Sequence, residues 1–327
     1  MLSNTQKRLI LVVIDFLFSA FIWNVNASWG NPFLTCLILS TTTFLIVLTP
    51  FEIYWSFRDI WFDRWVPLQL QDLEISKVRI SVGDGFLNAD LVKPKNIEKI
   101  KSKEAIIVIS HGFSDTKETL QYYYYPLALH GYVILAYDAR GMGESKKAGK
   151  RSHFLKRIED YNKILDWIKN NDNLSQKKIF STGISIGAIT VLCGGFQRED
   201  VEKIIAISSM SFYRQNIPKY NPLVLFSYFI KGVKLFPNEE ENTKLSPYLV
   251  FKKLKEGLSS EDWKLFSQKV MLIHCKNDKI IKFKNFKENR TILETPEKNL
   301  LTLRKGGHSQ KKNELALVGA TLKFFNS

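Results

Sequence analysis

Short runs of consecutive apolar residues recur along the chain from about residue 73, and segments with helical periodicity separate most of them. Such a run is typical of a strand that is buried on both faces of a parallel sheet, because a strand with one face in solvent alternates apolar and polar residues. The alternation of strands and helices predicts an α/β fold with an open, mostly parallel sheet and helices on both faces. The predicted strands are Ala105–Ile109, Tyr132–Tyr137, Lys178–Thr182, Ile204–Ser208, Val270–His274 and Leu300–Leu303.

Two segments of this domain, which we expect to span 73–327, depart from the alternation. Val78–Val82 and Phe86–Lys93 flank a Gly-Asp-Gly turn, which predicts an antiparallel hairpin. Residues 212–268 separate two predicted strands, contain four prolines and are rich in Phe, Tyr and Leu. Because a loop of that length without structure of its own is uncommon, we expect a small helical cap there.

The first seventy residues contain two apolar runs, at about 9–25 and 33–49. Each is roughly 25 Å long as a helix, slightly short of a typical hydrocarbon core, and tryptophans follow both runs as in interfacial belts. We expect 1–72 to be a membrane-anchoring segment that forms a transmembrane helical hairpin. Two other interpretations stay open. One is a signal peptide cleaved after Ala27; the other is a pair of buried helices, which Asp15 favours because a carboxylate at mid-membrane is costly.

The distribution of charge would orient such a hairpin. The net charge is +15, but the first seventy residues hold four basic and four acidic side chains, so the whole excess lies in 71–327. The link 24–32 is uncharged, whereas Lys or Arg flanks both outer ends of the hairpin. The positive-inside tendency then predicts a membrane protein with two spans and a cytoplasmic hydrophilic domain. No recognised nucleic-acid-binding module accompanies the basic residues, so we expect the lipid bilayer, not nucleic acid, as the partner.

Cysteine usage narrows the class of protein further. Cys36, Cys193 and Cys275 are odd in number, widely spaced and embedded in apolar runs. This pattern excludes a disulfide-rich scaffold and predicts buried thiols in a reducing compartment. The sequence has no Cys/His cluster with zinc-ligand spacing and no dinucleotide fingerprint in its proper context. We therefore expect neither a metal nor a cofactor.

One motif indicates nucleophilic chemistry. Gly183-Ile184-Ser185-Ile186-Gly187 follows a predicted strand and opens a predicted helix. The pattern alone is a weak signal, since an ordinary turn with a helix N-cap can produce it. On a sharp strand-to-helix turn, however, the serine is exposed at the sheet edge and the helix amino terminus favours developing negative charge. Ser185 is therefore the candidate nucleophile, with Gly183 and Gly187 allowing the chains to pass closely.

A nucleophilic serine needs a base, an orienting acid and an oxyanion hole. His308 follows the last predicted strand and Asp278 follows the preceding one, so they are the candidate base and acid. The chain order Ser, Asp, His is that of enzymes with a nucleophile elbow. The backbone N–H groups of Phe113, which follows His111-Gly112 after an early strand, and of Ile186 are the candidate oxyanion hole.

The body of the chain, from about Leu73 to the C-terminus, resembles the α/β-hydrolase superfamily. The resemblance rests on the elbow, on His111-Gly112, on the late Asp and His, and on residues 137–145 (YDARGMGES), which are similar to a structural D-x-R-G-x-G-x-S loop of that family. It implies the α/β-hydrolase fold and acyl transfer in two steps. His308 takes the proton of Ser185 while Asp278 holds the imidazole, and water then cleaves the acyl-enzyme. The resemblance leaves 1–72 unexplained.

These features together favour a membrane-anchored serine hydrolase that cleaves an ester of a small acyl or lipid substrate, as a carboxylesterase, lipase or lysophospholipase does. A peptidase or an acyl-thioesterase would use the same residues, because the shapes of the cap and acyl pocket select the substrate. A non-catalytic membrane scaffold on a hydrolase fold is the remaining alternative, which the complete set of candidate catalytic residues disfavours. The sequence does not indicate an oligomeric state.

Overall fold

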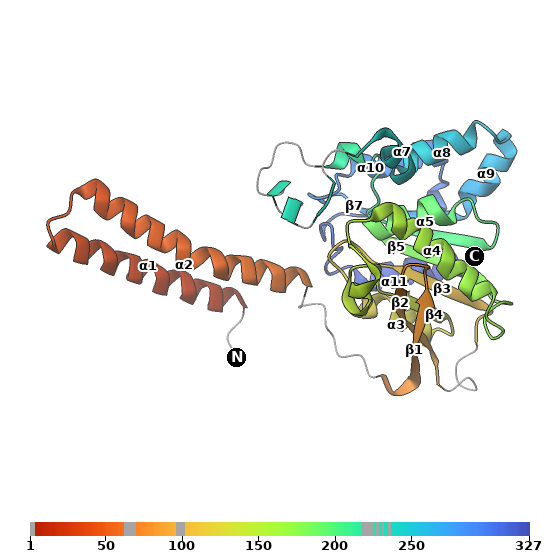
Figure 1. Ribbon diagram of the computed structural model, residues 1–327, viewed down its shortest axis with the longest axis horizontal. Coiled ribbons are helices and arrows are strands. Elements are labelled where there is room, and N and C mark those ends of the chain that lie inside the picture. Colours follow the sequence, from red (N-terminus) through yellow and green to blue (C-terminus); the bar gives the residue numbers. More distant parts are fainter. Residues whose placement is uncertain are drawn as a thin grey trace. The chain divides into compact units, whose positions relative to one another are not determined.

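The computed structural model describes residues 4–61, 70–95, 102–217, 225–226, 229–230, 232–234 and 237–327. The chain divides into two compact units, Met1–Trp65 and Val66–Ser327 (Figure 1).

The first unit is a pair of helices, α1 (Asn4–Ser28) and α2 (Phe33–Trp61), which pack side by side as a hairpin. Both helices extend beyond the predicted apolar runs and include polar flanking residues. Within them, Arg8–Ser28 and Phe33–Tyr54 are long and apolar enough to cross a membrane, by length and composition. Asp15, Ser19 and Cys36 are buried, whereas apolar side chains such as Phe16 and Leu34 are exposed. The helix pair therefore shields polar groups and presents an apolar surface.

The second unit is built on an eight-stranded sheet with the strand order β1-β2-β4-β3-β5-β6-β7-β8. Strand β2 runs antiparallel to β1 and β4, and the remaining pairs are parallel. The predicted α/β fold is confirmed, as are the hairpin (β1 and β2) and the six further strands, although the edge strand β8 is only partly buried. The strands are β1 (Leu73–Ser81), β2 (Phe86–Pro94), β3 (Ala105–Ser110), β4 (Val133–Tyr137), β5 (Lys178–Ile184), β6 (Val201–Ile207), β7 (Val270–Cys275) and β8 (Leu300–Leu303).

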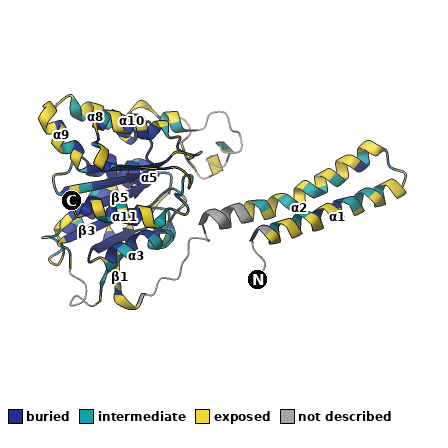
Figure 2. Ribbon diagram, turned by 180° about the vertical axis from the view of Figure 1, so that it is seen from behind, coloured by how far each residue is buried: buried dark blue, intermediate teal, exposed yellow. Residues whose placement is uncertain are grey.

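Helices cover both faces of this sheet, and successive residues of a strand enter two different cores. In β3, Ile106 and Val108 belong to one core, and Ile107 and Ile109 belong to the other. This is why the central strands are continuously apolar, and Figure 2 shows strands such as β3 buried along their length. One face carries α3 (Gln121–Leu129) and α11 (Glu314–Phe325); the other carries α4 (Phe154–Lys169), α5 (Ile186–Gly195), α8 (Pro247–Lys255), α9 (Ser260–Gln268) and α10 (Lys284–Leu293).

Short helices complete the connections. Helix α7 (Glu239–Leu245) packs against α4, α5 and α8. The 3-10 elements are η1 (Leu70–Asp72), η2 (Glu118–Leu120), η3 (Gly143–Ala148), η4 (Arg214–Asn216) and η5 (Glu297–Asn299).

The segment predicted as a cap, 212–268, consists of two different parts. Its second part contains α8 and α9, whose Phe251 and Trp263 are buried against Phe196 of α5. These helices, which lie between β6 and β7 in the chain, therefore belong to the layer that covers one face of the sheet. The first part, 212–246, contains η4 and α7, and it is the only part that remains a candidate cap. Its residues 218–224, 227–228, 231 and 235–236 lie outside the described residues.

Candidate active site

Ser185 lies on a sharp turn between β5 and α5. Its φ of 57° and ψ of −117° are rare for a residue with a side chain, and such strain is common at reactive centres. The turn is held because the N–H of Ser185 donates to the carbonyl of Ile207, at 2.9 Å. A Cβ on Gly183 would overlap the carbonyl oxygen of Gly187, and one on Gly187 would overlap that of Ser110. The close approach of three backbone segments therefore requires both glycines of the motif.

The three candidate catalytic side chains meet at the carboxyl edge of the sheet. The hydroxyl of Ser185 lies 2.9 Å from Nε2 of His308, and the opposite ring nitrogen, Nδ1, lies 2.8 Å from Oδ2 of Asp278. The second carboxylate oxygen, Oδ1, accepts the N–H groups of Ile280 and Ile281, each at 2.9 Å. The side chain of Asp278 is fully buried, whereas that of His308 is 21% exposed. The structure thus brings together the three residues that chain order and strand ends indicated.

Asp278 is held in its ionised form despite this burial. Burial alone would raise its pKa, but the hydrogen bond and charge interaction with His308 and the two backbone N–H groups outweigh it, so the pKa lies below its usual value. An ionised Asp278 can keep the proton of His308 on Nδ1. The other ring nitrogen is then a free acceptor that faces Ser185.

The His111-Gly112 turn lies beside the nucleophile. A Cβ added to Gly112 would be 3.6 Å from the Cβ of Ser185, so the chain that leads into Phe113 passes close to the serine. The N–H of Gly112 donates to Oδ2 of Asp115, at 3.2 Å, which fixes the turn. Ile186 is the first residue of α5, where a backbone N–H has no partner within the helix. Ile186 therefore adjoins Ser185 along the chain, and the His111-Gly112 turn brings the chain that leads into Phe113 close to Ser185.

His111 has a structural role in that turn. Its Nε2 accepts the N–H of Ala139, at 2.9 Å, and its Nδ1 donates to the carbonyl of Gly112, at 2.7 Å. Arg157 donates to the carbonyl of His111 at 2.6 Å. Complete burial, and then the charge of Arg157, lower the pKa of His111 to about 3. The imidazole is therefore neutral and holds the turn against the end of β4.

Sequence reasoning missed the residues that position the loop of His308. Nε2 of Gln310 donates to the carbonyl of His308 and to the hydroxyl of Ser208, both at 2.6 Å. On the other side of the loop, Oδ1 of Asn277 accepts the N–H of Gly307, at 2.9 Å. These contacts tie the β8–α11 loop to the ends of β6 and β7. No sequence pattern marks a glutamine or an asparagine for such a task.

Three carboxylates near the sheet edge, those of Glu118, Asp138 and Glu144, lie close enough to hold a metal ion. The ammonium group of Lys117 already lies among them, at 2.5 Å, 3.2 Å and 2.6 Å respectively. Burial disfavours this charge, but the hydrogen bonds with Glu118 and Glu144 outweigh the penalty and raise the pKa of Lys117. The cluster is therefore an ion-pair network centred on a lysine.

Comparisons with known proteins agree with this geometry. Residues 101–256 match a family described as serine aminopeptidase, S33. An esterase of Pyrococcus furiosus is 19% identical with a TM-score of 0.55, over 80% of this chain and 94% of its own. An α/β serine hydrolase without a lid from Xanthomonas campestris is 15% identical with a TM-score of 0.52, over 77% of this chain and 94% of its own. An acylaminoacyl peptidase of Pyrococcus horikoshii is 18% identical with a TM-score of 0.56, over 79% of this chain but 42% of its own. No curated relative matches the sequence.

These likenesses to solved structures establish the fold, and the family match covers the segment that contains the nucleophile elbow. The chain therefore has the α/β-hydrolase fold, and its residues 101–256 are similar to the serine aminopeptidase, S33, family.

Proposed function

We propose that this chain hydrolyses an acyl ester through Ser185, His308 and Asp278. The observation that carries the proposal is the continuous hydrogen-bonded path from the serine hydroxyl through both ring nitrogens to a buried carboxylate. That path begins at a residue with a strained backbone at the amino end of a helix. Such an arrangement is suited to moving one proton away from a nucleophile and returning it to a leaving group.

In the first step, Oγ of Ser185 attacks the ester carbonyl carbon while Nε2 of His308 takes the hydroxyl proton. The new C–O bond converts the carbonyl oxygen to an oxyanion, and Asp278 stabilises the imidazolium that has formed. The C–O bond to the alcohol then breaks, and the alcohol leaves with the proton from His308. A water molecule repeats the sequence on the acyl-enzyme, releasing the acid and restoring the serine.

The oxyanion would be held by the backbone N–H groups of Ile186 and Phe113. The first lies at the positive end of the α5 dipole, which favours negative charge there. The second follows Gly112, whose close approach to Ser185 supports its assignment. Fixed donors of this kind lower the barrier because they need no reorganisation when the charge develops.

We further propose that α1 and α2 cross the membrane as a hairpin and keep the hydrolase domain on the cytoplasmic side. The length and composition of both helices and the burial of Asp15 within the unit support the hairpin. The uncharged link and the basic outer flanks support the orientation. Protease added to sealed inside-out vesicles should digest the hydrolase domain. Digestion in intact cells would place the domain outside and contradict the assignment.

The catalytic assignment is tested with the variant Ser185→Ala. It should retain the fold, lose labelling by a fluorophosphonate probe, and lose roughly 10⁴-fold or more of the hydrolysis rate of a short acyl ester. Ser309→Ala is the matched control, because Ser309 lies beside His308 and should leave labelling unchanged. Hydrolysis by Ser185→Ala within tenfold of the unmodified chain would refute the proposal.

A peptidase activity is the second candidate, because the matched family is described as serine aminopeptidase. The same nucleophile attacks an amide, but the amine must be protonated before it can leave. The catalytic residues therefore do not distinguish ester hydrolysis from amide hydrolysis. A competitive panel of acyl-glycerols, lysophospholipids, acyl thioesters and aminoacyl amides against the fluorophosphonate probe should show protection by esters first. Protection by aminoacyl amides alone would favour the peptidase.

A further inference from the structure

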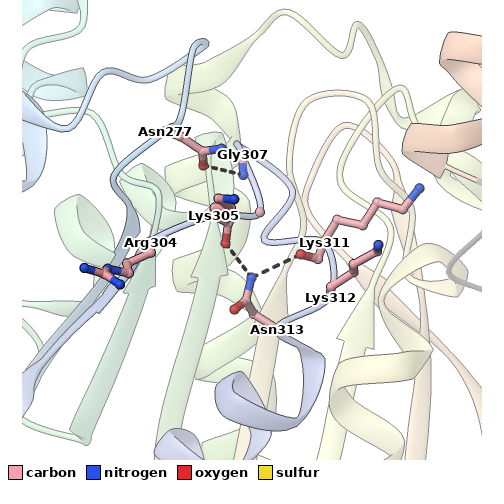
Figure 3. Close-up of a pocket in the computed structure, with 8 residues that line it drawn as sticks. Asn277, Arg304, Lys305, Gly307, Lys311, Lys312 and Asn313 are labelled. Carbon is pink, nitrogen blue, oxygen red and sulfur yellow. Dashed lines mark hydrogen bonds between the residues drawn. The ribbon is translucent and has the colours of Figure 1, made fainter.

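A hollow of about 540 Å³ lies on the outer side of the loop that carries His308. Its lining includes Arg304, Lys305, Lys311 and Lys312 from the β8–α11 connection, together with Asn277 and Asn313. Figure 3 shows Arg304 on one side of it and Lys311 and Lys312 on the other. No carboxylate lines this hollow in the described part of the chain. Four cationic residues therefore contribute to the lining of one concave surface.

The cations that line the hollow differ from those cations of the domain that form ion pairs. Twelve lysines and arginines of the domain, such as Lys77, Lys178 and Arg198, are paired with carboxylates. Among the described residues, by contrast, Arg304, Lys305 and Lys312 have no carboxylate within ion-pair distance. The nearest acidic neighbour in sequence, Glu314, accepts the backbone N–H of Lys312 at 3.1 Å instead. Arg304, Lys305 and Lys312 thus place positive charge with no ion-pair partner among the described residues at the lining of the hollow.

The loop that forms the hollow is rigidly built. The side-chain amide of Asn313 donates to the carbonyl of Lys305 at 2.7 Å and to that of Lys311 at 3.1 Å. The N–H of Lys311 donates to the carbonyl of Gly306, at 3.0 Å. Gly306 has a φ of 133°, which a side chain would disfavour. These bonds fix the backbone from which the cationic side chains extend, so the backbone of the loop needs little ordering when an anion binds.

The surroundings of the hollow indicate where the anion comes from. Leu315, three residues beyond Lys312, is 89% exposed, and Ile280, on the neighbouring loop next to Asp278, is 61% exposed. Lys279 and Lys282 flank Ile280 and are exposed as well. Exposed apolar side chains among cationic ones suit the boundary of an anionic bilayer, where phosphates meet acyl chains. Only residues 62–72 separate α2 from β1 in the sequence, which limits how far a membrane-anchored domain can move away.

We propose that this hollow binds the phosphate group of an anionic membrane lipid and holds the loop of His308 against the bilayer. The proposal rests on the proposed membrane anchorage but not on the assignment of Ser185. Phosphate is the favoured chemistry because guanidinium and ammonium groups donate to its several oxygens. A lipid headgroup and free phosphate share this chemistry, so the test separates the two sources.

The test uses the full chain in zwitterionic detergent micelles, with an environment-sensitive fluorophore on Leu315→Cys. The native cysteines are buried, which limits labelling to the introduced thiol. Adding short-chain phosphatidylglycerol should shift the emission to the blue and saturate, whereas short-chain phosphatidylcholine should not. Each cation near an anionic surface contributes roughly fivefold to affinity, so Arg304→Gln/Lys305→Gln/Lys312→Gln should weaken the response on the order of 100-fold.

A matched variant removes the same charge elsewhere. Lys252, Lys264 and Lys298 are exposed on α8, α9 and η5 and form no ion pair among the described residues, so replacing all three by Gln should leave the titration unchanged. The proposal is overturned if phosphatidylcholine produces an equal shift, or if the hollow variant titrates like the unmodified chain. It is also overturned if inorganic phosphate, at constant ionic strength, competes as well as the lipid, since the ligand would then be free phosphate. Hydrolysis of a soluble short ester should be equal in both triple variants, and loss of the Ser185 assignment would leave the lipid titration intact.

Discussion

Replacing His111 by glutamine should remove a large part of the acid sensitivity of the folded hydrolase domain. In the fold the imidazole is completely buried, accepts the N–H of Ala139 and donates to the carbonyl of Gly112. A proton on Nε2 would point at another N–H group and would be an uncompensated buried charge. The folded state therefore resists protonation of His111, whereas the unfolded chain does not. Glutamine can accept and donate in a similar manner without titrating.

The size of the effect follows from the two pKa values. The pKa of His111 is about 3 in the fold, against 6.5 for an unperturbed histidine. Between these values the unfolded chain binds the extra proton, so stability falls as the pH is lowered below about 6.5. From pH 7.5 to pH 5.0 the loss from this one residue is about 2 kcal/mol, because each pH unit below 6.5 costs about 1.4 kcal/mol.

Urea unfolding of the full chain in neutral detergent, followed by tryptophan fluorescence, measures this loss at both pH values. The unmodified chain should lose about 2 kcal/mol more than His111→Gln between pH 7.5 and 5.0. His153→Gln is the control, because His153 is exposed and should keep the pH dependence of the unmodified chain. Equal losses in the unmodified chain and in His111→Gln would refute the reasoning, even if the variant were less stable at both pH values.

Three further substitutions test the construction of the site. Gly187→Ala should cost about 3 kcal/mol of unfolding free energy, because its Cβ would meet a backbone oxygen, whereas Gly319→Ala in the open middle of α11 should be neutral or slightly stabilising in the same urea titration. Asp278→Asn should lower kcat for a short ester by roughly 10⁴-fold with little change in KM, and a loss below tenfold would contradict its orienting role. Gln310→Ala should lower kcat by roughly 10- to 100-fold and slow fluorophosphonate labelling in parallel, because the loop of His308 loses its tie; unchanged labelling would show that Gln310 does not position the base.

The central strands could be predicted from sequence because they are apolar on both faces, and the departures from prediction have local causes. Strand β6 begins at Val201 instead of Ile204, since Glu202 and Lys203 interrupt the apolar run although the backbone continues to pair with β5. The second half of the predicted cap packs into the core because Phe251 on α8, which Pro247 begins, and Trp263 on α9 are both buried. From the sequence alone, the prolines and aromatic residues of this stretch were as consistent with an irregular insertion as with helices that pack on the sheet.

The candidate site likewise contains residues that the sequence predicts and one that it does not. Ser185, Asp278 and His308 each follow a strand of the sheet, so strand ends and chain order sufficed to predict that they meet. Gln310 was not predictable, because its contact with His308 depends on a backbone φ of 50° that its residue type does not demand. Its effect arises from the shape of the loop, which is a property of the folded chain.

The position of β8 at the edge of the sheet has a consequence for how hydrolysis would be lost on warming. This strand has four residues, pairs only with β7, and leads directly into the loop of His308. Edge segments of this kind open locally at a lower free energy than a sheet's interior. Amide hydrogens of β8 should therefore exchange sooner than those of β5, and warming should silence hydrolysis while the circular dichroism of the helices still persists. His308, the proton acceptor, would then be displaced at a lower temperature than Ser185, the nucleophile.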